Sequence, residues 1–384
     1  DCTGKADGTL SGLSVFCRIL FCIMIKAIKI ILKVLLALII AAVPVIAGYL
    51  GYVYFSYSRI ADNLQLTPTN SAKEGQAAAG ETYTIVTQNI GFGAYTQDFT
   101  FFMDGGTESR AKSKESVVEC VQNASKAVQL LKPDFAFFQE VDTDADRSFH
   151  VDQRKIIDGY FDDYASVFAE NYHSAYLFYP ILKPHGASNS GIYTFSRFDM
   201  QSAVRRSLPV SNGLEKFLDL DRCYSVTRIP VDNGKQLVLY NVHTSAYGAD
   251  EEVRAAQLNM LFSDMEAEYK KGNYCVCGGD FNHDFTGDST FVFNKAENVS
   301  YGWAQPFPED ILAGYDGISR ALNYKGAPVA TCRNCDVPYD ENTFTLIVDG
   351  FLVSDNVEVV SVVNVDTEFV YSDHNPVAMQ FILK

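Results

Sequence analysis

An uninterrupted apolar run near the N-terminus is the strongest hydrophobic pattern in the chain. Residues 34–55 (VLLALIIAAVPVIAGYLGYVYF) contain no charged side chain, and a helix of that length can cross a hydrocarbon core of about 30 Å. Lys26, Lys29 and Lys33 precede the run. This positive charge predicts a cytoplasmic segment over residues 1–33, with the chain after the run outside the cell. The competing interpretation is a cleaved signal peptide, whose apolar core would be shorter, so we expect an uncleaved single-pass anchor in the cell membrane.

A polar stretch follows the apolar run. Residues 62–82 (DNLQLTPTNSAKEGQAAAGET) are rich in Ala, Gly, Thr and Asn and lack aromatic side chains. This composition predicts a flexible linker over residues 56–82. Hydrophobic periodicity resumes at Tyr83, which predicts one globular domain over residues 83–384.

Two hydrophobic periods alternate within this domain. Short apolar or alternating runs predict strands at residues 83–88, 135–139, 191–196, 236–241, 274–278, 344–353 and 377–383. Apolar positions at three- and four-residue steps predict helices over residues 113–131 and 250–271. Strands that alternate with helices are typical of an α/β architecture, in which the loops at strand ends carry the chemistry.

Charge is distributed unevenly along the 384 residues, which have a net charge of -16. Residues 1–81 contain 7 of the 31 Lys and Arg and 5 of the 47 Asp and Glu. The remainder therefore has 24 basic and 42 acidic residues, a balance of -18. A groove that follows a nucleic-acid backbone normally needs a basic surface. The acidic domain weakens a nuclease interpretation without excluding it.

Two short motifs carry candidate chemistry. Asp280 and Asn282 follow the apolar run 274–276, and side chains two residues apart lie on the same face of an extended chain. Near the C-terminus, Asp373 and His374 stand side by side before another apolar run. Carboxylates and an imidazole suit a hard divalent cation and a developing oxyanion, so the motifs predict metal-assisted phosphoester hydrolysis.

Polar groups of this kind recur at several predicted strand ends. In chain order they are Gln88-Asn89, Gln139-Glu140, Asn241-Val242-His243, Asp280-Phe281-Asn282 and Asp373-His374, and Asp349 interrupts a further apolar run. This ordered set resembles the endonuclease/exonuclease/phosphatase superfamily over residues 83–384, here as a membrane-anchored bacterial member. The resemblance implies a four-layer α/β sandwich of two mixed β-sheets flanked by helices, preceded by one transmembrane helix.

The resemblance also implies a role for each of these residues. Asn89, Glu140 and Asp373 match the positions that hold the divalent cation, with Glu140 as the principal ligand. Asp280 would orient or deprotonate the attacking water. Asn282 would steady that water or the phosphate oxygens.

Three further residues complete the implied machinery. His243 is similar to the histidine that assists the leaving group or binds phosphate. His374 would donate to the non-bridging oxygens in the transition state, and Asp349 would fix the tautomer of His374. The expected metal is Mg²⁺, with Mn²⁺ as an alternative, because Mg²⁺ takes one or two carboxylates and keeps several waters. A zinc site would need several His or Cys ligands, and none cluster in the sequence.

Two residues are candidates for substrate binding. Arg147 lies in the segment EVDTDADRS, which is similar to many bacterial members of the superfamily, and its guanidinium suits phosphate oxygens. A surface ion pair with Asp144 or Asp146 explains Arg147 equally well. The loop at residues 184–191 (PHGASNSG) precedes a strand where the superfamily lines its cleft, and Asn189 is its candidate substrate contact.

The predicted function is divalent-metal-dependent hydrolysis of a phosphodiester by in-line water attack, at a nuclease-like site outside the cell membrane. The alternatives are a lipid head-group phosphodiesterase, a phosphomonoesterase and, as a different class, a catalytically silent surface binding module. We expect nucleic acid or a lipid head group as substrate, and no protein partner. Exposed apolar residues among 172–180 would indicate a lipid enzyme, whereas Lys183, Arg205 and Arg206 beside the cleft would indicate a nuclease.

Overall fold

The computed structural model describes residues 8–69, 72, 74–213, 216–219, 221–246, 251–293 and 305–384. The chain divides into two compact units, Asp1–Tyr57 and Ser58–Lys384. The first unit contains one helix, α1 (Gly8–Ser56), with Pro44 inside it. Its part Phe16–Ser56 is long and apolar enough to cross a membrane. The span expected at residues 34–55 lies within that part.

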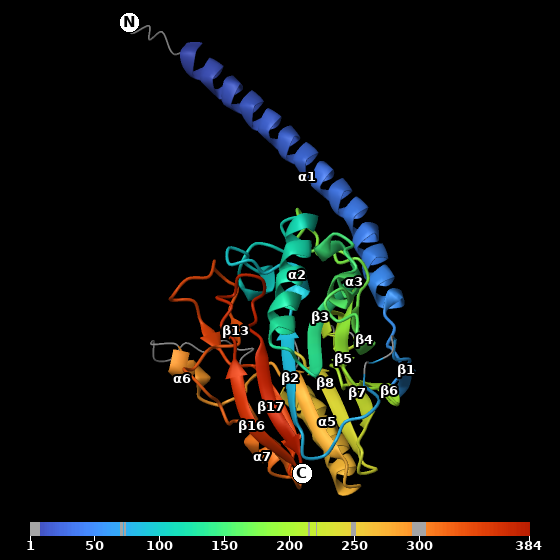
Figure 1. Ribbon diagram of the computed structural model, residues 1–384. Coiled ribbons are helices and arrows are strands. Elements are labelled where there is room, and N and C mark those ends of the chain that lie inside the picture. The colour runs from blue at the N-terminus through green and yellow to red at the C-terminus, as the bar shows by residue number, and fades with distance from the viewer. Residues whose placement is uncertain are drawn as a thin grey trace, which may run out of the picture. The chain divides into compact units, whose positions relative to one another are not determined.

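The second unit is built on two large β-sheets. The six-stranded sheet has the order β16-β17-β2-β3-β5-β4, which can be followed in Figure 1. Its strands are β2 (Thr82–Asn89), β3 (Phe135–Ala145), β4 (Ala165–His173), β5 (Ser188–Ser196), β16 (Val357–Asn364) and β17 (Val377–Leu383). The seven-stranded sheet has the order β1-β6-β7-β8-β9-β15-β12. Its strands are β1 (Leu64–Leu66), β6 (Ser202–Ser207), β7 (Cys223–Pro230), β8 (Gln236–His243), β9 (Tyr274–Asp280), β12 (Ile318–Arg320) and β15 (Asp349–Ser354).

Smaller elements fill the connections. Two short pairs, β10 (His283–Asp284) with β11 (Gln305–Pro306) and β13 (Cys332–Arg333) with β14 (Thr345–Leu346), lie outside the large sheets. The longer helices of the domain are α2 (Lys114–Leu130) and α5 (Glu251–Lys270). Shorter ones are α3 (Gln153–Asp158), α4 (Lys216–Asp219), α6 (Ser289–Phe293) and α7 (Glu309–Leu312). Three 3-10 turns, η1 (Gly91–Gly93), η2 (Phe102–Asp104) and η3 (Asp146–Ser148), complete the described elements.

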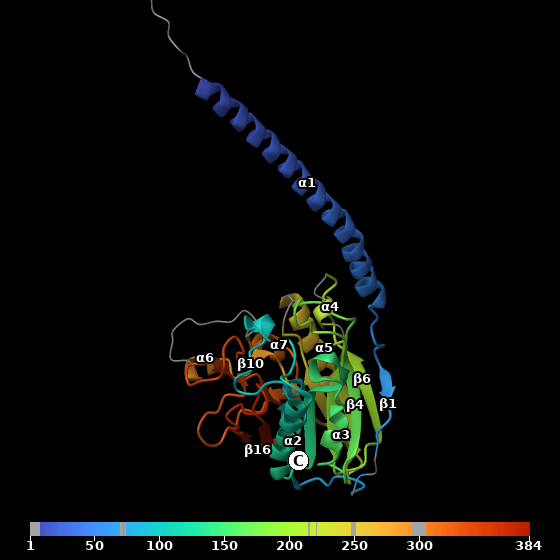
Figure 2. The same ribbon diagram turned by 90° about the horizontal axis from the view of Figure 1, so that it is seen from above.

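Strand β3 shows how alternation builds the layers. Phe135 and Phe137 point into the core between the two sheets, whereas Ala136 and Phe138 point into the core under α2 and α3. Both sets are buried, as the near-continuous apolar run of a central strand requires. A third core lies between the seven-stranded sheet and α5. Figure 2 shows α2 and α3 on one side of the sheets and α5 on the other. The expected four-layer sandwich is confirmed.

Parallel pairs at the centre of each sheet set the position of the site. Strands β2 and β3 are parallel, and so are β8 and β9, while their outer neighbours are antiparallel. Both sheets are therefore mixed. The carboxyl ends of parallel neighbours lie at the same edge of a sheet. Asn89, His243 and Asp280 are the last residues of their strands, so the chain gathers polar groups at one end of the sandwich.

Within the segment expected to be a flexible linker, residues 56–82, several of the described residues pair with the domain. β1 pairs with β6, and Ala77 is buried in the core between the sheets. Further backbone bridges join Thr69 to Ser166 and Glu74 to Phe198. The compact unit accordingly begins at Ser58 rather than at residue 83. The prediction of flexibility relied on the polar composition of this segment. Backbone hydrogen bonds hold the segment in place, and these do not depend on the type of side chain.

Element boundaries differ from expectation in a few other places. The predicted strand 344–353 is two strands, β14 and β15, separated at residues 347 and 348. Strands β4, β6, β7 and β16 were not predicted. Both predicted long helices are present, and Gly272 follows α5 with a left-handed φ of 81° that ends the helix. Residue 250, the expected start of that helix, lies outside the described residues.

Candidate active site

Two residues, one at an irregularity within β3 and one just after β9, have left-handed backbone conformations that change the direction of their side chains. Glu140 has a φ of 55°, and the pairing of β3 with β5 shifts between Phe138 and Val141. Asn282, two residues after β9, has a φ of 47°. Non-glycine residues in this region are strained, and such strain is concentrated at functional sites, where bulges redirect side chains.

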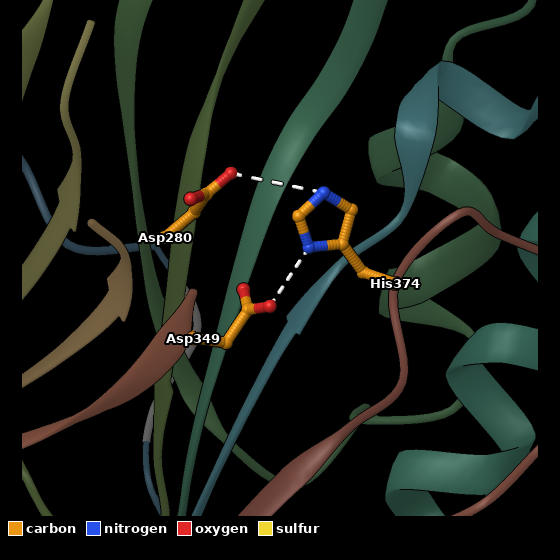
Figure 3. A group of neighbouring side chains, drawn as sticks. All are labelled: Asp280, Asp349 and His374. Carbon is orange, nitrogen blue, oxygen red and sulfur yellow. Dashed lines mark hydrogen bonds and ion pairs between the residues drawn. The ribbon is translucent and has the colours of Figure 1, made fainter. Parts of the chain in front are cut away.

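Asp280, Asp349 and His374 form the centre of the site (Figure 3). Asp349, the first residue of β15, lies directly opposite Asp280 in the antiparallel ladder with β9. The imidazole of His374 lies between the two carboxylates: its Nδ1 is 2.8 Å from Asp349 Oδ2, and its Nε2 is 3.8 Å from Asp280 Oδ2. All three residues are buried, so these charges interact with little screening by water.

The electrostatics of this cluster favour a protonated histidine. Burial acts to lower the pKa of His374, but the Asp349 carboxylate and the neighbouring Cys332 and Asp373 raise it well above its ordinary value. Burial also raises the pKa of Asp280, an effect that His374 opposes and Asp349 reinforces. The result is a cationic hydrogen-bond donor next to a carboxylate that is a stronger base than an exposed aspartate.

Asn89 connects this cluster to Glu140. Its Nδ2 donates to Asp280 Oδ2 at 3.0 Å and to Glu140 Oε1 at 3.3 Å, and its Oδ1 accepts from the Gly91 N–H at 2.9 Å. Asp373 lies close by, because a Cβ on Gly91 would stand 2.5 Å from Asp373 Oδ1. The close approach of the Asp373 carboxylate to the backbone at residue 91 therefore requires glycine there.

The residues around Glu140 fit a divalent cation. Burial raises the pKa of Asp373, and although His374 opposes this, the nearby negative charge of Glu140 adds to the rise. Two like charges in a buried place are stabilised by a cation between them. The carboxylates of Glu140 and Asp373 are oxygen donors that Mg²⁺ prefers. Asn89 presents its Nδ2 to Glu140, so its oxygen would reach a cation there only after the amide turns over.

The acidic–imidazole group Asp280, Asp349 and His374 fits a metal less well. Its possible ligand atoms lie within 4.8 Å of one another. However, both ring nitrogens of His374 already face carboxylates, Nδ1 that of Asp349 and Nε2 that of Asp280. The residues that could hold a metal ion are therefore Glu140 and Asp373, with the Asn89 carboxamide beside them.

His243 and Asn282 complete the polar end of β8 and β9. His243 Nε2 is 3.5 Å from Asp280 Oδ2. Burial lowers the pKa of His243 well below its ordinary value, and nearby Arg222 and His374 add to this, which leaves a neutral imidazole. The N–H of Asn282 donates to Asp280 Oδ1 at 2.9 Å, and its Nδ2 donates to the Thr244 carbonyl at 3.0 Å. These bonds hold Asp280 and Asn282 in fixed orientations.

The two predicted substrate-binding residues lie outside this cluster. Arg147 forms a buried bidentate ion pair with Asp142, with distances of 2.8 and 3.0 Å, and its guanidinium lies 4.0 Å from the Phe92 ring centroid. Neither Asp144 nor Asp146, the partners considered from the sequence, accepts this arginine among the described contacts. Asn189 is exposed near the start of β5. In the described part of the chain, neither residue hydrogen-bonds to Asp280, Asp349 or His374.

Several supporting residues carried no clear signal in the sequence. Thr331 Oγ1 accepts the N–H groups of Val348 and Asp349 at 3.0 and 3.1 Å, which fixes the start of β15. The N–H of buried Arg333 donates to the Asp373 carbonyl at 3.0 Å. In the sequence Arg333 lies between Cys332 and Cys335, away from the polar motifs at the predicted strand ends. Its position beside the site follows only from the long-range pairing of chain segments.

A similar contact joins the two sheets behind the site. Gln139 Nε2 donates to Asn241 Oδ1 at 2.8 Å across the interface between the sheets. Both residues are fully buried. Each stands next to a predicted functional residue in the motifs Gln139-Glu140 and Asn241-Val242-His243. A buried, satisfied pair of this kind fixes the relative position of β3 and β8.

Comparison with known proteins agrees with this geometry. A sequence model of the Endonuclease/Exonuclease/phosphatase family matches residues 86–374. No curated protein matches the chain. Among solved structures, a family protein from Beutenbergia cavernae DSM 12333 is 17% identical with a TM-score of 0.53, covering 79% of this chain and 72% of that one. A family protein from Bacteroides thetaiotaomicron is 17% identical with a TM-score of 0.52, covering 79% and 96%.

A mannosyl-6-phosphatase from Bacteroides thetaiotaomicron VPI-5482 is also 17% identical, with a TM-score of 0.50, covering 78% of this chain and 99% of that one. At these identities the structural likeness establishes the fold. The family assignment depends on the sequence model, which covers most of the chain and runs from residue 86 within β2 through the Asp373–His374 motif. The protein belongs to the endonuclease/exonuclease/phosphatase family of phosphoester hydrolases.

Proposed function

We propose that this protein is a divalent-metal-dependent phosphodiesterase that uses in-line attack of water and acts outside the membrane in which α1 anchors it. One observation carries the proposal: His374 is held between Asp349 and Asp280 at the end of the sandwich where Asn89 also reaches Asp280 and Glu140. A silent binding module has no need for a buried cation beside a buried base, which favours an enzyme.

The side chains divide the reaction between them. Asp280 orients the attacking water and accepts its proton. Its carboxylate has a raised pKa, and the Asn282 N–H fixes its orientation. His374 donates to a non-bridging phosphate oxygen, where negative charge accumulates in the transition state. Asp349 holds the imidazole by its Nδ1 and stabilises its positive charge. Neutral His243, whose Nε2 is 3.5 Å from Asp280 Oδ2, can accept or relay a proton.

The metal position supplies the remaining charge neutralisation. Glu140, Asp373 and the Asn89 carboxamide would hold a Mg²⁺ or Mn²⁺ ion, which neutralises phosphate oxygens when it is bound. Arg147 is already paired with Asp142, so its guanidinium is engaged within the protein.

The distribution of basic residues favours a lipid head group or a small phosphodiester over nucleic acid. Of the three cations that a nuclease was expected to use, Arg205 is buried with its guanidinium bound to backbone carbonyls and Ser207. Arg206 pairs with Asp62 and Asp264, and Lys183 pairs with Glu108. A nucleic-acid backbone would therefore meet an acidic domain without a free basic surface from these residues.

The test uses the full-length chain in detergent micelles with bis-p-nitrophenyl phosphate as substrate. We expect hydrolysis in Mg²⁺, loss of activity in EDTA, and a decrease of about 10³-fold in His374→Ala, the scale on which loss of a transition-state donor acts. His150→Ala is the matched control, because His150 is exposed and pairs only with surface carboxylates. Hydrolysis that persists in EDTA or in His374→Ala would contradict the proposal. Plasmid DNA and p-nitrophenyl phosphate, assayed in parallel, distinguish nuclease and monoesterase activities.

A further inference from the structure

The loop between β4 and β5 exposes an unusual group of apolar side chains. Phe178, Tyr179, Ile181 and Leu182 are 55%, 68%, 82% and 96% exposed. We call these four residues the apolar tip. Elsewhere in the described part of the domain, exposed large apolar side chains occur singly or as the pair Phe291 and Val292. Four within five residues form a local concentration that solubility alone does not favour.

The base of this loop is firmly held, so the exposure of the tip is built into the fold. Leu177 and Gly186 exchange backbone hydrogen bonds of 3.1 and 3.0 Å across the loop. Ser109 Oγ donates to the Lys183 carbonyl, and Arg110 Nε donates to the Pro184 carbonyl. The Tyr179 ring also contacts Phe102, with 5.7 Å between ring centroids. These contacts hold the loop in place, and a preorganised loop loses less entropy on binding.

The tip emerges at the end of the six-stranded sheet that carries the metal position. β4 ends at His173 and β5 begins at Ser188, so the loop joins them at this end. Ser188 pairs with Ala145, five residues beyond Glu140 on β3. β2 runs parallel to β3 and ends at Asn89, opposite Gln139. The tip therefore lies toward the end of the sheet at which β2 ends beside Glu140, and a surface that contacts the tip meets that end of the molecule.

We propose that the apolar tip inserts into the interface of a lipid bilayer and presents this end of the domain to the membrane. A convex group of four side chains is small for a stable protein interface, which buries about 800 Å² on each partner. It is sufficient for shallow insertion into a bilayer, where each apolar side chain gains by leaving water. Tyr179 has the amphipathic ring that is enriched at this depth, and Lys183 follows the tip directly.

The apolar helix α1 supports a bilayer as the partner. Phe16–Ser56 is long and apolar enough to cross a membrane, and a tethered domain meets the bilayer at a high effective concentration, so a weak contact is enough. Contact between the tip and lipid does not require hydrolysis. Its use to reach phosphoesters at a lipid surface rests on the function proposed above.

The experiment uses residues 58–384, without α1, so that the tip alone can provide membrane affinity. All members of the five hydrophobic clusters, from Leu66 and Ala77 onward in the sequence, lie within this unit. The unit therefore has its own core. Cosedimentation with phosphatidylcholine vesicles measures binding. We expect Leu182→Ser to weaken binding about fivefold and Ile181→Ser/Leu182→Ser about twentyfold, from partial burial of each side chain.

The matched control is Leu130→Ser. Leu130 is 69% exposed at the end of α2, just before Phe135, where β3 begins, whereas the tip lies beyond Ala145, where β3 ends. We expect it to bind vesicles like the wild type. Failure of the wild-type domain to bind vesicles, or equal weakening by Leu130→Ser and Leu182→Ser, would overturn the proposal, and the first result would point to a protein partner for the tip.

Hydrolysis of soluble bis-p-nitrophenyl phosphate separates this proposal from the proposed function. We expect Leu182→Ser to retain that activity while it loses activity on phosphodiesters presented in vesicles. If no variant hydrolyses the soluble substrate but vesicle binding follows the tip, the membrane contact is supported and the proposed function fails.

Discussion

Replacing Asp349 with asparagine is expected to lower kcat about 10³-fold with little change in KM. Asp349 Oδ2 lies 2.8 Å from His374 Nδ1, and both residues are buried. The substitution preserves the shape of the side chain but removes the negative charge that stabilises the imidazolium. His374 then loses both its fixed tautomer and most of its positive charge at the moment of transition-state formation.

The magnitude follows from the geometry. A hydrogen bond of 2.8 Å places the centres of the imidazolium and carboxylate charges about 4 Å apart, which at an effective dielectric constant of 20 corresponds to about 4 kcal/mol. Each decrease of about 1.4 kcal/mol in transition-state stabilisation lowers the rate tenfold. The loss appears in kcat because the charge on the phosphate oxygens grows only in the transition state.

Initial rates with bis-p-nitrophenyl phosphate in Mg²⁺ measure the effect. Asp355→Asn is the matched control, because Asp355 is an exposed carboxylate just after the other end of β15. Thermal unfolding of both variants establishes that the fold is retained. A kcat within about threefold of the wild type, from a folded Asp349→Asn protein, would refute the role assigned to the His374–Asp349 pair.

Three further predictions concern the metal, a buried ion pair and pH. Glu140→Gln is expected to abolish the rise in Tm that Mg²⁺ produces in the wild type. It is also expected to lower the Mg²⁺-dependent activity by at least about a hundredfold. Arg147→Ala leaves the buried Asp142 carboxylate unpaired and is expected to lower the free energy of unfolding in urea by about 3–5 kcal/mol. The hydrogen bond to Asp221 raises the pKa of His173, although burial opposes the rise. The stabilisation that protonated His173 gives the folded state is therefore full below the ordinary histidine pKa and is lost as pH rises through the raised pKa. In His173→Gln, the free energy of unfolding should fall less across that pH interval than in the wild type.

Each of these predictions has its own control and contrary result. Glu358→Gln, on the exposed face of β16, should leave the Mg²⁺ response intact, and an unchanged response in Glu140→Gln would remove Glu140 from the metal position. Arg154→Ala, which breaks a partly exposed pair with Asp152, should cost under about 1 kcal/mol. A raised KM with unchanged stability in Arg147→Ala would restore the phosphate-binding role. For His173, identical stability–pH curves in wild type and variant would contradict the argument.

The central strands and the order of the polar motifs could be predicted from the sequence because one physical pattern governs both. Strands buried on both faces have short apolar sequences, and the candidate functional residues follow directly after such sequences end. Asn89, His243 and Asp280 were placed correctly at strand ends for this reason. The catalytic and metal-binding roles of these residues stay predictions that the proposed assays test.

The partner of Arg147 could not be predicted because the polar residues after Glu140 belong to a strand. β3 continues through the shift at Glu140 to Ala145, so Asp142 is a buried strand residue rather than part of a surface loop. Hydrophobic periodicity ends before that point, and nothing local indicates the continuation. By contrast, β16 (VEVVSVVN) has a strongly β-branched pattern that could have been recognised.

The direct opposition of Asp280 and Asp349 in the ladder between β9 and β15 also bears on how this protein can change. Backbone hydrogen bonds between two neighbouring strands set the separation of the two carboxylates, while the long segment between them in sequence leaves the sheet and returns to it. Insertions and deletions in that segment can alter what reaches the site without altering the spacing of the reacting groups. A single residue inserted within either strand would instead turn its carboxylate to the opposite face of the sheet. Grafting of loops is therefore the route by which new selectivity can be engineered into this scaffold, and the ladder itself is the part to leave untouched.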